Sequence, residues 1–282
     1  MVEEYLIPMA WSMGYILEAF ILLWIAKFAY TRIYRRVDLK AELFERGNHA
    51  LAVSIAGYLF GIIIAFGGVL EGTSAGWKAD LAGIASSGIL AILLMLVASF
   101  MCEKLLLPHF DNTREIVEKH NLGTSFVEAG VHIANGMIVL AISQGGEPGW
   151  NGIAFWLLAQ LVLILVGVLY EWVTPHRIHH EISRSNAAVG LAFGGALVGM
   201  GNVVSIAASG DFEGWQASLT SFAGYALFGI IVLFIIKKLT DLLLAPGVKL
   251  SAQQSQDTPN IGAGLIEALG YVGASMLIVW VL

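Results

Sequence analysis

The sequence predicts an all-α fold, a polytopic transmembrane bundle of eight spans arranged as two parallel four-helix repeats. The first observation is composition: 57% of the 282 residues are hydrophobic and only 13% are charged, which is far from the composition of soluble domains. The second is length, because the apolar runs reach about twenty residues, enough to cross a hydrocarbon core roughly 30 Å thick. The third is an internal repeat, in which the segment that begins at Asn48 recurs from Asn186.

The apolar runs give the predicted spans in chain order. All six prolines lie near the ends of these runs or between them, where a missing backbone N–H does least harm to a helix. The chain starts with Glu3 and Glu4 and no basic residue, unlike a cleaved signal peptide, so we expect the first span to be retained. The predicted spans are residues 6–30, 48–70, 79–101, 122–142, 150–173, 186–208, 215–236 and 261–281.

The repeat defines two units. Residues 48–108 align with residues 186–246 without a gap, and a one-residue insertion continues the alignment into the last span. Self-similarity of this kind marks a duplicated structural unit. We therefore predict two domains, residues 1–146 and 147–282, each a four-span membrane unit. Because four is an even number, both units have the same orientation, and we expect a pseudo-two-fold axis along the membrane normal.

Charged residues indicate the orientation. All but one of the 15 Lys and Arg residues lie at one end of the spans, and Lys78 alone lies at the other. Because loops rich in Lys and Arg stay in the cytoplasm, we predict cytoplasmic basic loops and outward-facing termini. The outer loops are acidic and would raise the local cation concentration, although short solvated loops explain the same pattern. The residues at the basic end are Lys27, Arg32, Arg35, Arg36, Lys40, Arg46, Lys104, Arg114, Lys119, Arg177, Arg184, Lys237, Lys238 and Lys249, and the outer acids are Glu3, Glu4, Glu71, Asp80, Glu147, Asp211 and Glu213.

The strongest candidate site lies in the fourth span. Glu128, His132 and Asn135 stand at positions i, i+4 and i+7, on one face of a helix. A charged side chain at the centre of a membrane helix costs roughly 2.5–3.5 kcal/mol, so such residues face a bundle interior or a wet cavity. One interpretation is a stripe that handles protons or a small cation, and the other is a polar clamp between neighbouring helices.

The second copy keeps only part of this pattern. Glu267 aligns with Glu128, whereas Tyr271 and Ala274 replace the histidine and the asparagine. The repeat therefore indicates either one specialised site or a role for the glutamates alone. The sequence leaves open whether the two glutamates share one cavity.

Glu18 is a further acid near the middle of the first span, with no acid at the matching place in the fifth. Such an acid needs a partner. His132 and Asn202 are the candidate partners, and Glu18 joins Glu128, His132, Asn135 and Glu267 as a candidate residue for an ion pathway.

The second and sixth spans begin and pack alike. Each starts with an asparagine, a preferred N-cap, so Asn48 and Asn186 are predicted to cap these helices. Each then carries two glycines four residues apart, which let helix backbones approach closely. We expect these spans at the heart of their units or against one another. The packing glycines are Gly57 and Gly61 in the first copy and Gly195 and Gly199 in the second.

Sequence motifs for nucleotide binding, zinc proteolysis or a serine nucleophile do not occur in the chain. We therefore predict that the protein is not an enzyme and holds no cofactor. His176, His179 and His180 cluster between the fifth and sixth spans, but no cysteine or carboxylate pattern completes a metal site. A cationic flank is the preferred interpretation, so no metal is predicted. Cys102 is the only cysteine, which excludes an intrachain disulfide.

Residues 48–61 and 186–199 each open with Asn-x-Ala and continue with small residues at helical spacing. In this respect the chain resembles the YjfL-like bacterial inner-membrane family, the domain of unknown function 350, whose members are built from four-span units. The resemblance covers both halves of the chain. It implies a location in the bacterial inner membrane and links to envelope-stress or polyamine-related systems, and it implies no particular activity and no catalytic residue.

The leading hypothesis is a channel or secondary transporter for protons or a small cation, based on the buried acids and the acidic outer loops. The alternative is a non-conducting membrane platform that recruits cytoplasmic stress-response proteins through its basic loops. The lipid bilayer is the partner that composition requires. A homo-oligomer is compatible with the sequence, since symmetric assemblies are common, and no nucleic-acid binding is expected.

Overall fold

The computed structural model describes residues 7–34, 37–71, 74–108, 111–144, 149–210 and 212–281. Within these residues the chain is helical, without strands, and eight helices are long and apolar enough to cross a membrane. The predicted fold class is therefore confirmed. The long helices are α1 (Ile7–Thr31), α2 (His49–Leu70), α3 (Trp77–Met101), α5 (Leu122–Ser143), α6 (Trp150–Val173), α8 (Ala187–Ala208), α9 (Trp215–Leu239) and α11 (Ile261–Val281).

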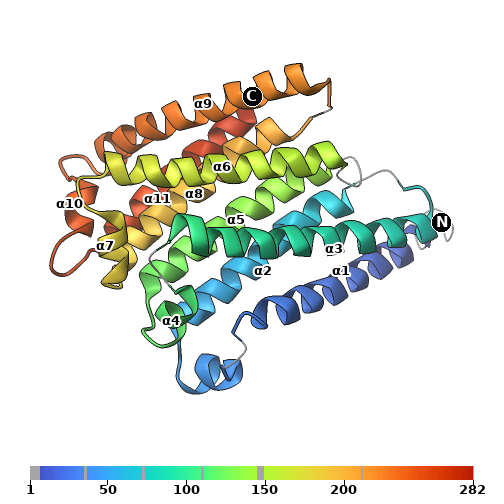
Figure 1. The fold of residues 1–282 in the computed structure, drawn as a ribbon, viewed down its shortest axis with the longest axis horizontal. Helices are drawn as coiled ribbons and strands as arrows, with labels where there is room; N and C mark the ends of the chain where they lie inside the picture. Colours follow the sequence, from blue (N-terminus) through green and yellow to red (C-terminus); the bar gives the residue numbers. More distant parts are fainter. Residues whose placement is uncertain are drawn as a thin grey trace.

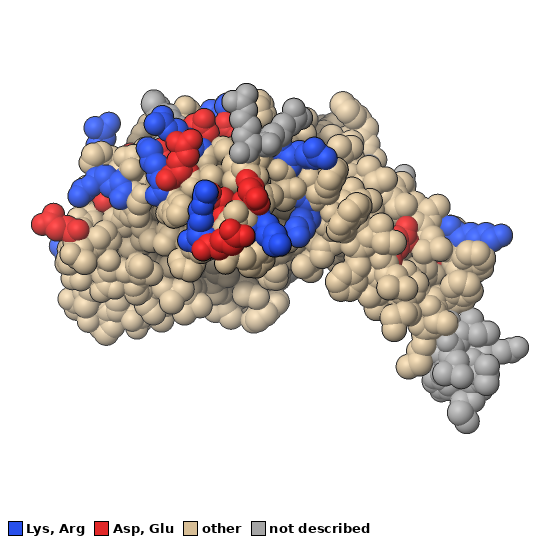
Figure 2. Space-filling view, turned by 90° about the horizontal axis from the view of Figure 1, so that it is seen from below, with Lys and Arg blue, Asp and Glu red and all other residues tan. Residues whose placement is uncertain are grey.

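Six short helical elements follow the odd-numbered spans, and we call the end of the bundle where they lie the basic end. Figure 1 shows α4, α7 and α10 together at this end, and Figure 2 shows most of the visible Lys, Arg, Asp and Glu side chains gathered toward it. The opposite end, the far end, holds the shorter connections between the even-numbered spans and the spans that follow them. The short elements are the π-helical turns η2 (Ala41–Glu45), η3 (Cys102–Leu106) and η4 (Thr240–Leu244) and the helices α4 (Asn112–Val117), α7 (Ile178–Ser183) and α10 (Leu250–Gln254).

Four of the long helices form a row. α2 packs on α5, α5 on α8 and α8 on α11, in that order. The other four helices lie over the row: α1 contacts α2 and α3, α3 contacts α2 and α5, α6 contacts α5 and α8, and α9 contacts α8 and α11. In Figure 1, α3, α6 and α9 run across the slanting helices of the row. The two middle helices of the row, α5 and α8, are the most buried of the described spans.

Small residues hold the row together. Gly130 of α5 and Gly194 of α8 touch so closely that a Cβ added to Gly130 would lie 2.5 Å from the carbonyl oxygen of Gly194. Close backbone approach of this kind is how membrane helices associate without a hydrophobic driving force. The four predicted packing glycines line two further contacts of the row: Gly57 and Gly61 against Ala129 and His132 of α5, and Gly195 and Gly199 against Ala268 and Tyr271 of α11. Each predicted glycine pair therefore packs against the fourth span of its own unit, and α2 and α8 are not neighbours in the row.

The two units follow one another head to tail. A two-fold axis along the membrane normal would make the contacts between the units reciprocal, so that α5 against α8 would be matched by α11 against α2. α5 of the first unit does pack on α8 of the second, the equivalent of α2, but among the described residues α11 has no comparable contact with α2. The predicted pseudo-two-fold is therefore wrong, because the fourth span packs on second spans on both of its sides. An interface between unlike surfaces is of the heterologous type.

Asparagine caps link each row helix to the next. The side chains of Asn48, Asn121 and Asn186 accept hydrogen bonds from backbone N–H groups in the first turns of α2, α5 and α8, which satisfies otherwise free helix donors. The amide of each side chain also donates to a backbone carbonyl of the short element that precedes the next row helix. These donations run from Asn48 to Ile116 (3.1 Å), from Asn121 to Ile182 (2.8 Å) and from Asn186 to Gln254 (2.9 Å).

Some predicted features lie outside the described residues. The predicted boundary between residues 146 and 147 falls there, as do several of the charged residues used to predict orientation. These charged residues are Glu3, Glu4, Arg35, Arg36, Glu147 and Asp211.

Candidate functional site

The candidate site is built around Glu128, whose side chain is buried on the face of α5 that meets α1, α2 and α3 and is only 5% exposed. Ser54 of α2 donates a hydrogen bond from its Oγ to Glu128 Oε2 at 2.7 Å. The hydroxyl groups of Tyr30 and Tyr34 lie 3.0 and 3.1 Å from the same Ser54 Oγ. Since Ser54 gives its one proton to Glu128, both tyrosines donate to Ser54 in this arrangement.

His132 extends the hydrogen bonds one turn toward the far end. Its Nε2 lies 3.1 Å from the Tyr30 hydroxyl and its Nδ1 lies 3.5 Å from Ser99 Oγ, while Glu128 Oε1 is 4.0 Å from Nε2. The ring is completely buried, with its edge toward the stacked rings of Tyr30 and Tyr58. Serine, tyrosine and histidine can each donate and accept. The Glu128–Ser54–Tyr30–His132 chain can therefore reverse its hydrogen bonds when a proton is gained or lost.

A cavity of about 420 Å³, the basic-end cavity, reaches this chain from the basic end. Asn112 of α4 lies in its wall and is only 3% exposed, yet neither its Oδ1 nor its Nδ2 has a hydrogen-bond partner. Buried amides are nearly always satisfied, so this pair of free atoms is a notable exception. The lining residues include Arg32, Tyr34, Ser99, Glu103, Asn112 and Glu128.

Asn135 ends the polar face of α5. It accepts a hydrogen bond from Gln160 of α6 at 2.6 Å and donates to the carbonyl of Val131 at 3.0 Å. Farther along α5, Ile138 and Val139 are buried and apolar. Asn135 thus joins α5 to α6, and it has no hydrogen bond to the Glu128 chain among the described residues.

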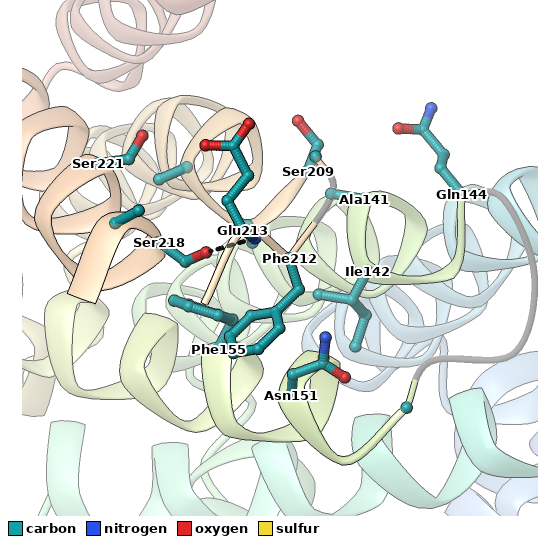
Figure 3. Close-up of a pocket in the computed structure, with 16 residues that line it drawn as sticks. Ala141, Ile142, Gln144, Asn151, Phe155, Ser209, Phe212, Glu213, Ser218 and Ser221 are labelled. Atoms are coloured by element: carbon teal, nitrogen blue, oxygen red, sulfur yellow. Dashed lines mark hydrogen bonds between the residues drawn. The ribbon is translucent and has the colours of Figure 1, made fainter. Parts of the chain in front are cut away.

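A second cavity of about 520 Å³, the far-end cavity, opens at the opposite end between α5, α6, α8 and α9. Figure 3 shows Phe155, Phe212 and Ile142 among its lining residues, with the backbone N–H of Glu213 donating to Ser218. Asn135 and Ile142 are two turns apart, roughly 10 Å along the helix. The buried residues of α5 in this interval include Ile138, Val139 and Ala141, and the two cavities share no lining residue.

The second unit holds its glutamate differently. Glu267 of α11 accepts hydrogen bonds from Tyr170 at 3.0 Å and from Gln254 at 2.7 Å. The ammonium of Lys237 lies 3.3 Å from Glu267 Oε1 and 5.1 Å from the centre of the Tyr170 ring. The side chain of Lys237 is only 13% exposed. The sequence predicts the seventh span to end at residue 236, before Lys237, and this is wrong. Lys237 lies in the last turn of α9, where its ion pair with Glu267 lets a lysine remain inside the helix.

The repeat sets these two arrangements side by side. Glu128 aligns with Glu267, and Ser99 aligns with Lys237 at the same position of α3 and α9. Among the described residues, no Lys or Arg lies within ion-pair distance of Glu128. In the part of the chain that the structure describes, the first unit therefore has a carboxyl group without a Lys or Arg partner beside a cavity, where the second unit has an ion pair.

Comparison with known proteins identifies the family. The family described as Domain of Unknown Function (DUF350) matches residues 5–143 and, a second time, residues 147–282. The chain belongs to this family. It is 29% identical over 125 residues to the "UPF0719 transmembrane protein YshE" of Bacillus subtilis (strain 168), which covers 44% of this chain and 87% of the relative. It is 21% identical over 249 residues to a "UPF0719 transmembrane protein" of Aquifex aeolicus (strain VF5), which covers 86% and 90%. No solved structure matches.

Glu18 lies apart from the site of this DUF350 chain. It is half-buried on α1, and its Oε2 has no hydrogen-bond partner. The two partners suggested for it bind elsewhere, since His132 lies beside Tyr30 and Asn202 donates to Ser275 at 3.2 Å. α1 is the most exposed of the described spans, which explains why the acid does not reach the row.

The histidine segment of this DUF350 chain forms contacts within the protein. His179 lies 3.0 Å from Glu171 and 3.1 Å from the carbonyl of Leu106. Burial and the nearby charge of Lys237 lower the pKa of His176, which favours its neutral form. Across the described part of the chain, no group of three or more His, Cys, Asp or Glu residues could hold a metal ion.

Sequence reasoning missed five residues of the site: Tyr30, Tyr34, Ser54, Ser99 and Asn112. Tyrosine and serine are common in membrane helices, so their type alone gives no signal. The alignment of the two repeats did contain a signal. It aligns Lys237 with Ser99, which lies inside a predicted span. Lys237 is therefore expected inside the membrane as well, where a lysine needs an acidic partner.

Proposed function

We propose that the protein is a secondary transporter that moves protons, or a small cation in exchange for protons, across the bacterial inner membrane. Glu128 is the proton-binding group. The observation that carries the proposal is the hydrogen-bond chain from Glu128 through Ser54 and Tyr30 to His132, placed at the inner end of the basic-end cavity. Groups that donate and accept in turn are the components of proton relays in membrane proteins.

The orientation is part of the proposal. The basic loops face the cytoplasm, and both termini face outward. The basic-end cavity then gives cytoplasmic water and ions access to Glu128. The apolar interval beyond Asn135 closes the path to the outside, which supports a transporter in an inward-facing state rather than an open channel. Alternating access in such proteins moves one group of helices against another.

The second unit acts as a scaffold in this proposal. Glu267 is already paired with Lys237 and accepts hydrogen bonds from Tyr170 and Gln254. A carboxylate that is paired and hydrogen-bonded is stabilised in its charged form. Glu267 therefore already holds a cation from its own chain, and the asymmetry between the copies reflects one specialised site.

Proton flux into liposomes tests the proposal. Purified protein is reconstituted with a pH-sensitive dye inside, and a pH gradient is imposed with a potassium gradient to balance charge. The wild type is expected to collapse the gradient, and Glu128→Gln to slow the collapse about tenfold or more. Glu18→Gln is the matched control, since Glu18 lies on the same helix as Tyr30 but its Oε2 has no hydrogen-bond partner, so the change removes a carboxyl group without touching the hydrogen-bond chain.

Equal flux in the wild type and Glu128→Gln would contradict the role of Glu128. If the wild type carries no flux under any gradient, whether of protons, sodium or potassium, the transporter proposal fails. The platform hypothesis then takes its place. It predicts a specific soluble partner crosslinked through the basic loop of residues 32–46, with the crosslink unchanged by Glu128→Gln.

A further inference from the structure

We propose that the basic-end cavity binds the primary ammonium group of a small organic molecule, at the place where the second unit holds the ammonium of Lys237. This inference rests on the proposed function, because it names the class of molecule that would be exchanged for protons. The inference is based on a comparison of the two units. In the second unit, the ammonium group of Lys237 pairs with Glu267. In the first unit, the ammonium group of a bound molecule would pair with Glu128.

The repeat supplies the correspondence. Residues 48–108 and 186–246 align without a gap, which places Ser99 and Lys237 at equivalent positions. The two helices that carry them have equivalent bounds, Trp77–Met101 and Trp215–Leu239. Both side chains face the fourth span of their unit: Ser99 lies 3.5 Å from His132, and Lys237 lies 3.3 Å from Glu267. The lysine ammonium in the second unit therefore marks a position that in the first unit belongs to the cavity beside Ser99 and Glu128.

The contacts of Lys237 define what that position accepts. Its ammonium meets a carboxylate oxygen and stands over the face of the Tyr170 ring, the two groups that bind alkylammonium ions best. The first unit offers the same kinds of group in the carboxyl of Glu128 and the ring of Tyr34, which lines the cavity. Asn112 adds a carbonyl oxygen with no partner.

The charges and the apolar wall agree with such a ligand. Among the described residues, two carboxyl groups, those of Glu103 and Glu128, line the cavity with one guanidinium, that of Arg32. The Arg32 guanidinium lies 4.3 Å from the centre of the Phe28 ring of α1, and Glu103 pairs with Lys104 at 2.5 Å. Ala29, Ile33, Leu96 and Phe100 supply the apolar part of the wall. A cavity of about 420 Å³ with an acid at its inner end and apolar sides suits an ammonium on a short alkyl chain.

The chemistry disfavours a metal ion. Calcium takes six to eight oxygen ligands and magnesium requires an octahedral set, whereas the described residues contain no group of three or more His, Cys, Asp or Glu that could hold a metal. An ammonium needs three acceptors at most. Glu128 and Asn112 supply oxygen acceptors at the inner end of this cavity.

Equilibrium binding of n-butylammonium chloride to the purified full-length protein tests the inference. Isothermal titration calorimetry in detergent at constant ionic strength is expected to show one saturable site, and sodium chloride at the same concentration should not compete. Ser99→Lys should weaken binding about tenfold or more, because it places an internal ammonium beside Glu128 as in the second unit. Ser99→Met fills the same space without charge, so Ser99→Lys should melt at a higher temperature than Ser99→Met.

The second unit provides a converse test. Lys237→Ala leaves Glu267 without its cation, and n-butylammonium should restore the lost thermal stability, whereas sodium at equal concentration should not. If this variant does not fold, the Ser99 variants still decide the matter. Absence of binding to the wild type, equal binding to Ser99→Lys, or equal competition by sodium would each overturn the inference. Because no transport is measured, ammonium binding without proton flux would refute the proposed function alone, and proton flux without ammonium binding would refute this inference alone.

Discussion

Gly130 and Leu269 occupy equivalent positions on α5 and α11, but they face different surroundings. Gly130 contacts the backbone of Gly194 between the two units, whereas Leu269 is 58% exposed on the outer face of the last span. The duplicated helix has thus kept a glycine where another helix touches it and a leucine where lipid does. Residue size at this one position separates the inner from the outer helix of the row.

Gly130→Leu should therefore separate α5 from α8. A Cβ at this site would already overlap the Gly194 backbone, and overpacking of this kind costs about 1–3 kcal/mol or more. Leu269→Ala, at the equivalent but exposed site, should change stability by only about 0.5 kcal/mol. Thermal unfolding of both variants in the same detergent gives the comparison, and similar losses would contradict the row arrangement.

The eight spans and the helix caps could be predicted from the sequence, because both depend on local signals. A run of about twenty apolar residues has one stable solution in a bilayer, and an asparagine before a helix needs only its own first turn to act as a cap. The order of the row could not be predicted in this way. Which face of α5 meets α8 depends on Gly130 and Gly194 being brought together, and each glycine alone looks the same as those that face lipid.

The site was partly predictable for a similar reason. Glu128 and His132 stand out because acids and histidines are costly inside a membrane. Their partners Ser54 and Tyr30 come from other helices, and only the packing of α1 and α2 against α5 brings them within hydrogen-bonding distance.

The asparagine links should contribute unequally to stability. Asn121→Ala removes the cap of α5 and its bond to Ile182, both buried, and loss of the cap alone costs about 1 kcal/mol. Asn260→Ala is the matched control, since Asn260 caps α11 but is exposed, with no acceptor for its amide among the described residues. Unfolding in mixed micelles should show a clearly larger loss for Asn121→Ala. Equal losses would mean that the links between short elements and caps contribute nothing beyond capping.

Tyr30→Phe should slow proton flux while keeping the fold. The variant retains the ring that stacks on Tyr58 and removes the hydroxyl between Ser54 and His132, and loss of a proton-transfer group reduces rates by about 10²-fold or more. Tyr58→Phe is the matched control, because the Tyr58 hydroxyl is buried without a hydrogen-bond partner. The liposome assay compares the two, and an unchanged rate in Tyr30→Phe would exclude a relay through this residue.

Lys237 and Glu267 should behave as a coupled pair. Lys237→Met leaves a buried carboxylate without its cation and should destabilise the protein by about 3–5 kcal/mol. Glu267→Gln in the same chain removes the uncompensated charge, so the double variant should recover most of the loss. A double-mutant cycle of unfolding free energies measures the coupling, and purely additive effects would show that the two charges do not interact.

The asparagine links all point in the same direction along the chain. Asn48 donates to α4, Asn121 to α7 and Asn186 to α10, and in every case the acceptor is synthesised after the donor. Insertion in chain order would therefore leave one N–H of each cap amide without its carbonyl acceptor until the next short element is made. The other N–H of Asn121 and of Asn186 already donates to a glutamate of the preceding short element.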